Sequence, residues 1–546
     1  MSLTKTDYIV QKYFIQEIDP KTKTEYFQCK KCKEANIVRI FKYRHFKDME
    51  RHLKGNPKQN NCHGLNLTKE LSAFAAVAKA NQTITAQTNN YQKSVRLLKD
   101  MAILNIPLSK LDDPAVRYLL EKNYEHVPCR TMARMYMSQL SKELELKRLN
   151  AYTVKQVCCL IIDGYQYGKV HTYSALFQTN GCEPKYIKTF STTDSQNAFW
   201  LFQELEEIIK KLGQHGLKVV AITGDTCSTI TCACKLLNQK WEDTKYKNDL
   251  SVKEKCLTNH KIIRCKCLAH IFSLILHDIS DEFRIVEMLS TLHQEKVAFK
   301  PYICTRFYSM RDTLKSLPAG SLYYQQDFIK VFDTLCTYIE KVEQDDSVVE
   351  NTEIHFKQLL KELDDQNTET ARFAKKVASE RLLDADNSTV SIMRLHQLLQ
   401  PTFKVEEYTP RQIRILCIRI NKLFDSIIEP IDSEILIQHY QRPQCENTRR
   451  YFTAMEMWED RGYNNITTFL EYCTVMQVSE CPVERTFSEM GHLIGQRRYN
   501  LSPEMLHDTF MIKDCAHEQY EQQAEKQERE SKQLEGPTKL SPAYKQ

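Results

Sequence analysis

Residues 157–164 read VCCLIIDG, which is six apolar residues followed by an acid and a glycine. An apolar run of this length predicts a strand that is buried on both faces of a sheet. A carboxylate is rarely buried without a partner. We therefore expect Asp163 to end a core strand and to present its side chain to a ligand.

The segments around this strand follow an α/β order. Residues 154–225 contain two strand-like runs, then the helical FWLFQELEEIIKKL, then the strand-like LKVVAITGD. Residues 262–279 predict a short strand that runs into an amphipathic helix, and the pattern from 310 to 465 is helical. The segment from 516 is polar, and we expect it to be disordered or a frayed helix.

A second strand of this section, LKVVAITGD, also ends in an acid, Asp225. Ligands of open α/β sheets bind at strand ends, and two carboxylates that meet there repel unless a cation neutralises them. Oxygen ligands favour Mg²⁺ or Mn²⁺, and a pair of such ions can activate water in phosphodiester chemistry. The alternative is that each Asp caps a turn or the following helix.

The composition is typical of a soluble globular protein, with 546 residues, 42% hydrophobic and 27% charged. No apolar stretch approaches the roughly 18 residues of a membrane-spanning helix, and the first residues lack the apolar core of a signal peptide. We expect a cytosolic or nuclear protein with no membrane partner. Its 20 cysteines should be mostly reduced, so that some are free to bind metal.

Positive charge is concentrated at the amino end. Residues 1–60 hold 14 Lys and Arg against 7 Asp and Glu, whereas the whole chain carries a net charge of +6. A local basic surface is a common footprint of nucleic-acid binding, although a solvated face without function is an equal alternative.

The same amino-terminal segment predicts a structural zinc site. The motif CKKC at 29–32 is followed by RHLKGNPKQNNC at 51–62, so the predicted ligands are Cys29, Cys32, His52 and Cys62. His45 and His63 are possible substitutes for the last two ligands. The basic residues that we expect to face DNA phosphates are Lys30, Lys31, Arg44 and Arg51.

Five motifs in order resemble the hAT (hobo/Activator) superfamily of cut-and-paste DNA transposases. They are IIDGY at 161–165, TGD at 223–225, RCKCLAH at 264–270, TRFYS at 305–309 and PVERTFSEMGHLIGQRRYNLSPE at 482–504. The resemblance covers most of residues 150–515, and the last motif resembles the superfamily's carboxy-terminal dimerisation signature. The amino-terminal zinc motif resembles the BED-type finger that often precedes hAT catalytic domains.

The resemblance implies an RNase H-like catalytic domain, interrupted by a large all-α insertion. Its acids would be Asp163, Asp225 and Glu484, which would hold the catalytic Mg²⁺ or Mn²⁺ ions. The family's first cut leaves hairpins on the flanking donor DNA, and 3′ hydroxyls later attack target DNA. The partners would be the terminal inverted repeats, target DNA and a second copy of the chain, in the nucleus.

Further residues match family positions for DNA contact. Cys267 and His270 match a CxxH element that helps to position DNA, although this spacing is also typical of a packed helix start. Phe307, after Arg306, replaces the family's Trp and offers a smaller stacking surface. Arg306 would contact a phosphate or be an ordinary surface charge. Two further arginines, Arg497 and Arg498, would clamp DNA or solvate a helix end.

We therefore predict a multi-domain α/β protein with six segments. They are a BED-type finger (1–65), a helical DNA-binding or dimerisation segment (66–150), the first part of the catalytic domain (151–309), the helical insertion (310–465), the last part with the dimerisation motif (466–515) and the polar tail (516–546). The predicted function is DNA transposition. A domesticated zinc-finger regulator that binds DNA without cutting it is the first alternative, and an RNase H-like nuclease without strand transfer is the second.

Overall fold

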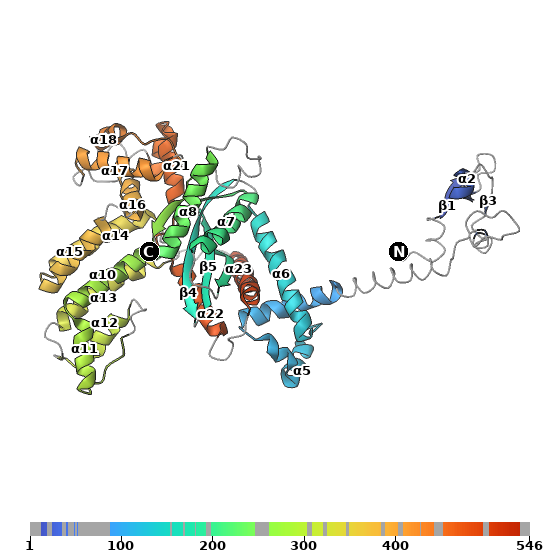
Figure 1. Cartoon of the computed structure of the whole chain (residues 1–546), viewed down its shortest axis with the longest axis horizontal. Coiled ribbons are helices and arrows are strands. Elements are labelled where there is room, and N and C mark those ends of the chain that lie inside the picture. The colour runs from blue at the N-terminus through green and yellow to red at the C-terminus, as the bar shows by residue number, and fades with distance from the viewer. Residues whose placement is uncertain are drawn as a thin grey trace, which may run out of the picture. The chain divides into compact units, whose positions relative to one another are not determined.

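The computed structural model describes residues 13–18, 25–34, 40–41, 49, 52, 88–152, 155–167, 170–180, 182–192, 198–225, 227–245, 261–302, 308–319, 321, 325–344, 349–383, 388–401, 408–425, 427–441, 451, 453–494 and 502–534. The chain forms two compact units (Figure 1). The first contains Met1–Leu97 and Lys110–Arg130, and the second contains Leu98–Ser109 and Thr131–Gln546.

The first unit contains a small antiparallel sheet in the order β1-β2-β3. Its strands are β1 (Phe14–Ile18), β2 (Glu25–Cys29) and β3 (Ile40–Phe41), and the short helix α2 (Lys30–Glu34) follows β2 directly. The unit also contains α5 (Pro114–Asn123), which begins with Pro at its first position after the cap residue Asp113. The Asp113 carboxylate accepts hydrogen bonds from the backbone N–H groups of residues 115 and 116, which is a favourable helix start.

The second unit is built around a mixed five-stranded sheet. Its strands are β4 (Gln156–Tyr167), β5 (Val170–Thr179), β6 (Lys185–Thr192), β7 (Leu217–Gly224) and β8 (Ile263–Lys266), in the order β6-β5-β4-β7-β8. The pairs β4–β5 and β5–β6 are antiparallel, whereas β4–β7 and β7–β8 are parallel. Both acid-ended runs form strands of this sheet, as predicted, although the described part of the chain is mostly helical. Strand β6 was not predicted.

The two faces of this sheet pack against different helices. Cys158, Leu160 and Ile162 of β4 share a core with α7 (Ala198–Gln214) and α8 (Ser228–Lys245). Cys159, between them, belongs to the core that includes α10 (Leu268–Glu282). Because side chains alternate along a strand, Asp163 lies on the α10 face.

Helices also satisfy the hydrogen-bonding groups at both sheet edges. At β8, the Thr389 hydroxyl accepts from the N–H of Lys266 (2.8 Å) and donates to its carbonyl (3.0 Å), at the start of α16 (Ser388–Leu398). At β6, the N–H of Tyr186 donates to Asp514 of α23 (Pro503–Leu534; 3.3 Å), and its carbonyl accepts from Arg148 of α6 (Arg130–Asn150; 2.9 Å). Covered edges do not recruit other strands.

The described residues between 310 and 465 are largely helical, as the periodicity predicted, and further helix lies on both sides of this range, from 285 to 473. Besides α16, the helices are α11 (Ile285–Gln294), α12 (Ser309–Ser316), α13 (Gln325–Val342), α14 (Val349–Asp365), α15 (Glu369–Leu383), α17 (Pro410–Leu423), α18 (Ser433–Gln441), α20 (Ala454–Asp460) and α21 (Asn464–Cys473). Trp458 is fully buried among them, and its indole N–H donates to the Leu399 carbonyl (2.9 Å).

Helix α23 corrects one expectation about the tail. The polar segment after 516 continues as helix through Leu534, so disorder is wrong for this part and a helix is right. The remaining residues, 535–546, lie outside the described part of the chain. None of the helices that the structure describes is long and apolar enough to cross a bilayer.

Candidate metal centre

Asp163 and Asp225 lie at neighbouring strand ends. The last register pair of the parallel strands β4 and β7 joins Ile161 to Thr223, and each acid lies two residues further along the chain, Asp225 directly after the end of β7. Side chains two residues apart point to the same face, so we place both carboxylates on the α10 face of the sheet. The charge of Asp225 is one of the causes that raise the pKa of Asp163, which also indicates that the two groups are close.

The chain segment before α22 (Cys481–Ile494) packs onto this face. The Thr223 hydroxyl, two residues before Asp225, donates to the Gln477 carbonyl at 2.7 Å. The N–H of Leu268, at the start of α10, donates to the Val478 carbonyl at 2.8 Å. These buried contacts anchor the segment that leads into α22 beside the acid-ended strands.

The start of α22 is fixed at two further points. The N–H of Glu480 donates to the thiol sulfur of Cys267 at 3.4 Å, directly before the helix. Farther along α22, the Phe487 ring packs against Tyr165 with a centroid separation of 5.7 Å. Because Tyr165 lies two residues beyond Asp163 on β4, this contact brings α22 over the end of the strand.

This packing brings Glu480 and Glu484 to Asp163. The two glutamates are four residues apart, with Glu480 directly before α22 and Glu484 in its first turn, and the N–H of Glu484 donates to the Glu480 carbonyl at 3.2 Å. One ligand atom of each of the three acids, Asp163, Glu480 and Glu484, lies within 4.8 Å of those of the other two. The structure thus joins two of the three predicted acids directly, adds Glu480, and places Asp225 at the neighbouring strand end.

The electrostatics of the cluster disfavour ionised acids in the absence of a cation. Burial, reinforced by the charges of Glu484 and Asp225, raises the pKa of Asp163, although the Gly164 N–H donates to its carboxylate at 2.7 Å. Burial and the same neighbours raise the pKa of Glu480 well above its usual value. Burial raises the pKa of Glu484 to about 7. The protein groups around each of these acids do not offset the cost of burying its ionised carboxylate.

The donor set fits a hard divalent cation. Each ligand atom of the Asp163, Glu480 and Glu484 group is a carboxylate oxygen, the donor that Mg²⁺ and Mn²⁺ prefer. One oxygen of Glu480, Oε2, is buried and has no hydrogen-bond partner among the residues that the structure describes. A bound cation would satisfy this oxygen and would relieve the repulsion between the acids.

Cys267 and His270 lie at the start of α10, next to this cluster. Cys267 is 1% exposed, so its thiol is too buried to contact DNA. Its sulfur instead accepts a hydrogen bond from the N–H of Glu480. The direct DNA contact predicted for Cys267 is therefore replaced by a positioning role. His270 is half-buried, and burial lowers its pKa while the charge of Asp225 acts in the opposite direction. This effect indicates that His270 lies near Asp225.

A second group links Glu484 to the end of α13. Ligand atoms of Glu343, Cys481 and Glu484 lie within 4.8 Å of one another. Glu343 follows α13 directly, and its backbone carbonyl accepts a hydrogen bond from Arg485 at 2.9 Å. Its carboxylate accepts a hydrogen bond from the Tyr308 hydroxyl. These contacts connect the end of α13 to the helix that carries the third predicted acid.

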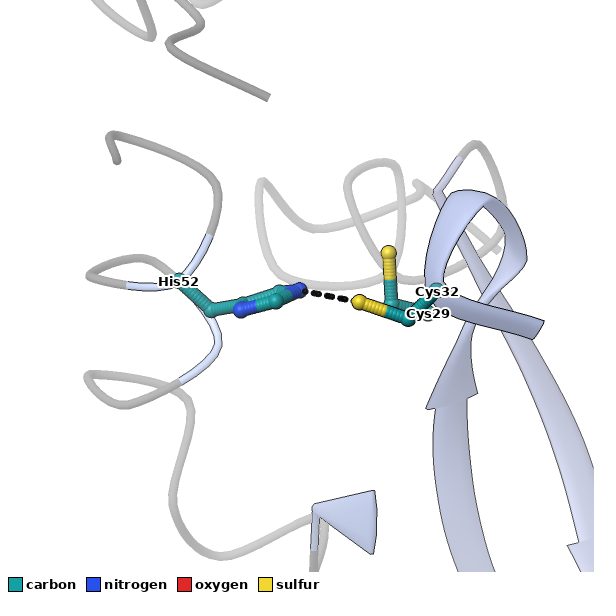
Figure 2. A group of neighbouring side chains, drawn as sticks. All are labelled: Cys29, Cys32 and His52. Atoms are coloured by element: carbon teal, nitrogen blue, oxygen red, sulfur yellow. Dashed lines mark hydrogen bonds between the residues drawn. The ribbon is translucent and has the colours of Figure 1, made fainter. Parts of the chain in front are cut away.

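The first unit contains a separate group of metal-binding type (Figure 2). Cys29, Cys32 and His52 are buried, and their ligand atoms lie within 4.8 Å of one another. The His52 Nε2 lies 3.3 Å from the Cys32 sulfur, and Figure 2 shows the imidazole ring turned toward this sulfur. Two cysteines and a histidine are compatible with structural zinc.

Several predicted site residues lie outside the described residues. They are the fourth zinc ligand Cys62 with its substitutes His45 and His63, and the arginines and aromatic residue of the DNA contacts, Arg44, Arg51, Arg306, Phe307, Arg497 and Arg498. Lys31 lies in α2, but its side chain is not described, whereas Lys30 is half-buried. The DNA contacts predicted for these residues remain predictions.

The sequence interpretation missed Glu480 and Glu343. The sequence did contain a signal for Glu480, because this residue precedes Glu484 by four positions, about one helical turn. Two acids at this spacing lie close together where a helix begins. Glu343 had none, because 141 residues separate it from Glu484 and its polar surroundings resemble an ordinary interhelical break.

The comparisons with known proteins show a distant structural likeness and no match in sequence. No family model matches the chain, and no curated protein matches it. Among solved structures, it is similar to the Drosophila P element transposase strand transfer complex, at 12% sequence identity and a TM-score of 0.31. This match covers 77% of this chain and 91% of that chain. So distant a likeness assigns no roles to residues, and those proposed below rest on the chain's own side chains.

Proposed function

We propose that this protein is a DNA transposase of the hAT type, which cuts DNA at terminal inverted repeats and joins the freed ends to target DNA. The observation that carries the proposal is the convergence of acids from β4 and α22, with Asp225 at the neighbouring end of β7. The strand order β6-β5-β4-β7-β8, in which an antiparallel hairpin pair precedes two parallel strands, supports an RNase H-like catalytic domain.

The acids have defined tasks in this proposal. Asp163, Asp225 and Glu484 would hold Mg²⁺ or Mn²⁺ against the scissile phosphate. When bound, such ions supply an activated water and stabilise the leaving oxygen of a phosphodiester. Thr223 and Cys267 would keep the ligands in place, because they tie the segment before α22 to the sheet and to α10.

The first unit would supply affinity for DNA. We propose that Cys29, Cys32 and His52, with Cys62 as fourth ligand, form a BED-type zinc finger in residues 1–65. We also propose that the protein forms a homodimer, that it acts in the nucleus and that it contains the six segments predicted from the sequence. Cys32→Ser should reduce bound zinc by one ion per chain, measured by atomic absorption, and weaken DNA binding. Unchanged zinc content in this variant would contradict the proposed zinc finger.

The proposal is tested by cleavage of DNA duplexes that carry the terminal inverted repeats flanking the coding sequence, with Mg²⁺ or Mn²⁺. The wild type should cut these duplexes and Glu484→Gln should not. Glu362→Gln is the matched control, because Glu362 is a half-buried glutamate on α14 that accepts a hydrogen bond from Tyr338 and belongs to no group of metal-binding type among the described residues. DNA binding without cutting by the wild type would favour the regulator instead.

A further inference from the structure

Glu480 is an acid of the candidate metal centre that neither the strand pattern nor the family resemblance assigns. Its residue is 2% exposed, and one of its carboxylate oxygens lies within 4.8 Å of ligand atoms of Asp163 and Glu484. Its Oε2 is buried and unpartnered among the residues that the structure describes. A buried acid with an unpaired oxygen calls for a compensating group.

The backbone of Glu480 is held firmly on both sides of the side chain. Its N–H donates to the Cys267 sulfur at 3.4 Å, and its carbonyl accepts from the N–H of Val483 at 2.8 Å. The N–H of the next residue, Cys481, donates to the Ser479 hydroxyl at 3.1 Å. The carboxylate is therefore held inside the cluster by the local fold, which preorganises it for a ligand.

Among the residues that the structure describes, no cation pairs with the buried Oε2 of Glu480. The charge of Arg264 acts against burial and the charges of Asp163, Asp225 and Glu484, which together still raise the pKa of Glu480. The Arg264 guanidinium instead donates to backbone carbonyls, including that of Gly224 at 3.2 Å. When the four carboxylates are ionised, their charge exceeds that of this backbone-bound arginine, and a further cation is needed to offset it.

We propose that Glu480 is a direct ligand of the divalent cation at this centre, together with Asp163 and Glu484. This inference rests on the proposed function, in that Asp163 and Glu484 hold the cation. Four ionised carboxylates, counting Asp225, carry the charge that two Mg²⁺ or Mn²⁺ ions neutralise. The competing role is that of a protonated, purely structural side chain, which would not contact the cation.

Mn²⁺ titration of the full chain, followed by electron paramagnetic resonance of the free ion, separates these roles without a need for activity. Glu480→Gln keeps the shape of the side chain and should weaken Mn²⁺ binding about tenfold or more. Glu484→Gln should weaken it similarly, and Glu362→Gln should bind as the wild type does. Wild-type affinity in Glu480→Gln, alongside weakened binding in Glu484→Gln, would overturn this inference and leave the proposed function standing. Wild-type protein that binds no Mn²⁺ would overturn both.

A second measurement covers the case in which Glu480→Gln does not fold, which circular dichroism would show. Anomalous scattering from Mn²⁺ in crystals of the wild-type chain locates the ion directly. A Mn²⁺ peak within coordination distance of a Glu480 oxygen is expected. A peak that contacts Asp163, Asp225 or Glu484 but not Glu480 would overturn the inference.

Discussion

Gly224→Ala tests whether the ends of β4 and β7 must lie close together for the centre to form. Gly224 is the last residue of β7, directly before Asp225. A Cβ atom at this position would lie 2.6 Å from the Ile162 carbonyl oxygen, next to Asp163 on β4, and 3.3 Å from the Ile162 side chain. Since the obstacle is backbone, a rotamer change cannot remove the clash.

The expected magnitude follows from this geometry. Contacts of Cβ below 3.0 Å are essentially never seen, so the strand ends must part by at least about 0.4 Å. Overpacking of this kind costs about 1–3 kcal/mol, and the lower entropy of the unfolded alanine chain returns about 0.4–1 kcal/mol. We expect a net loss of about 1–2 kcal/mol and, because Asp225 shifts relative to Asp163, Mn²⁺ binding about tenfold weaker.

Gly462→Ala is the matched control. Gly462 has a φ of +76° and open space around its Cβ position, so the variant costs about 1–2 kcal/mol of backbone strain with the same entropic return. Urea denaturation should show comparable stability losses in both variants, whereas Mn²⁺ titration should show weaker binding in Gly224→Ala alone. Mn²⁺ affinity equal to the wild type in Gly224→Ala would refute the reasoning.

Three further predictions concern stability. Trp458→Phe removes the donor to the buried Leu399 carbonyl and should cost about 2 kcal/mol in urea denaturation. Arg148→Met leaves Asp514 without its 2.7 Å ion pair and should cost about 3 kcal/mol, visible as a lower melting temperature. Burial lowers the pKa of His396 to about 4, so the unfolded chain binds a proton first as the pH falls below about 6.5. The free energy of unfolding should then fall by about 1.4 kcal/mol more per pH unit, down to pH 4, in the wild type than in His396→Gln; equal pH slopes in the two proteins would contradict this assignment.

The sequence predicted those strands of the sheet whose apolar pattern matches their burial in the fold. The apolar runs that end at Asp163 and Asp225 can lie only in a buried sheet, and both are core strands of the second unit. Strand β6 was missed because its lysines break the apolar pattern. Lys188 of β6 is paired with Glu204 of α7 at 2.7 Å, and this tertiary contact has no signature in sequence.

The candidate site was predictable in part for the same physical reason. Asp163 and Glu484 could be identified from sequence motifs. The distance between them in the fold depends on the packing of α22, which is fixed by contacts of Thr223, Cys267 and Phe487. Those contacts join residues that are hundreds of positions apart. Local periodicity carries no information about them, and so it could not identify the thiol of Cys267 as a support for the Glu480 backbone.

The most direct test of the central claim, that acids from three distant segments share cations, is affinity cleavage with Fe²⁺ in place of Mg²⁺. With ascorbate and peroxide, bound Fe²⁺ generates radicals that cut the nearby backbone. Cuts near residues 163, 225 and 480–484 should appear together and should be suppressed together by excess Mg²⁺. Cuts confined to one of these segments, or located elsewhere in the chain, would contradict it.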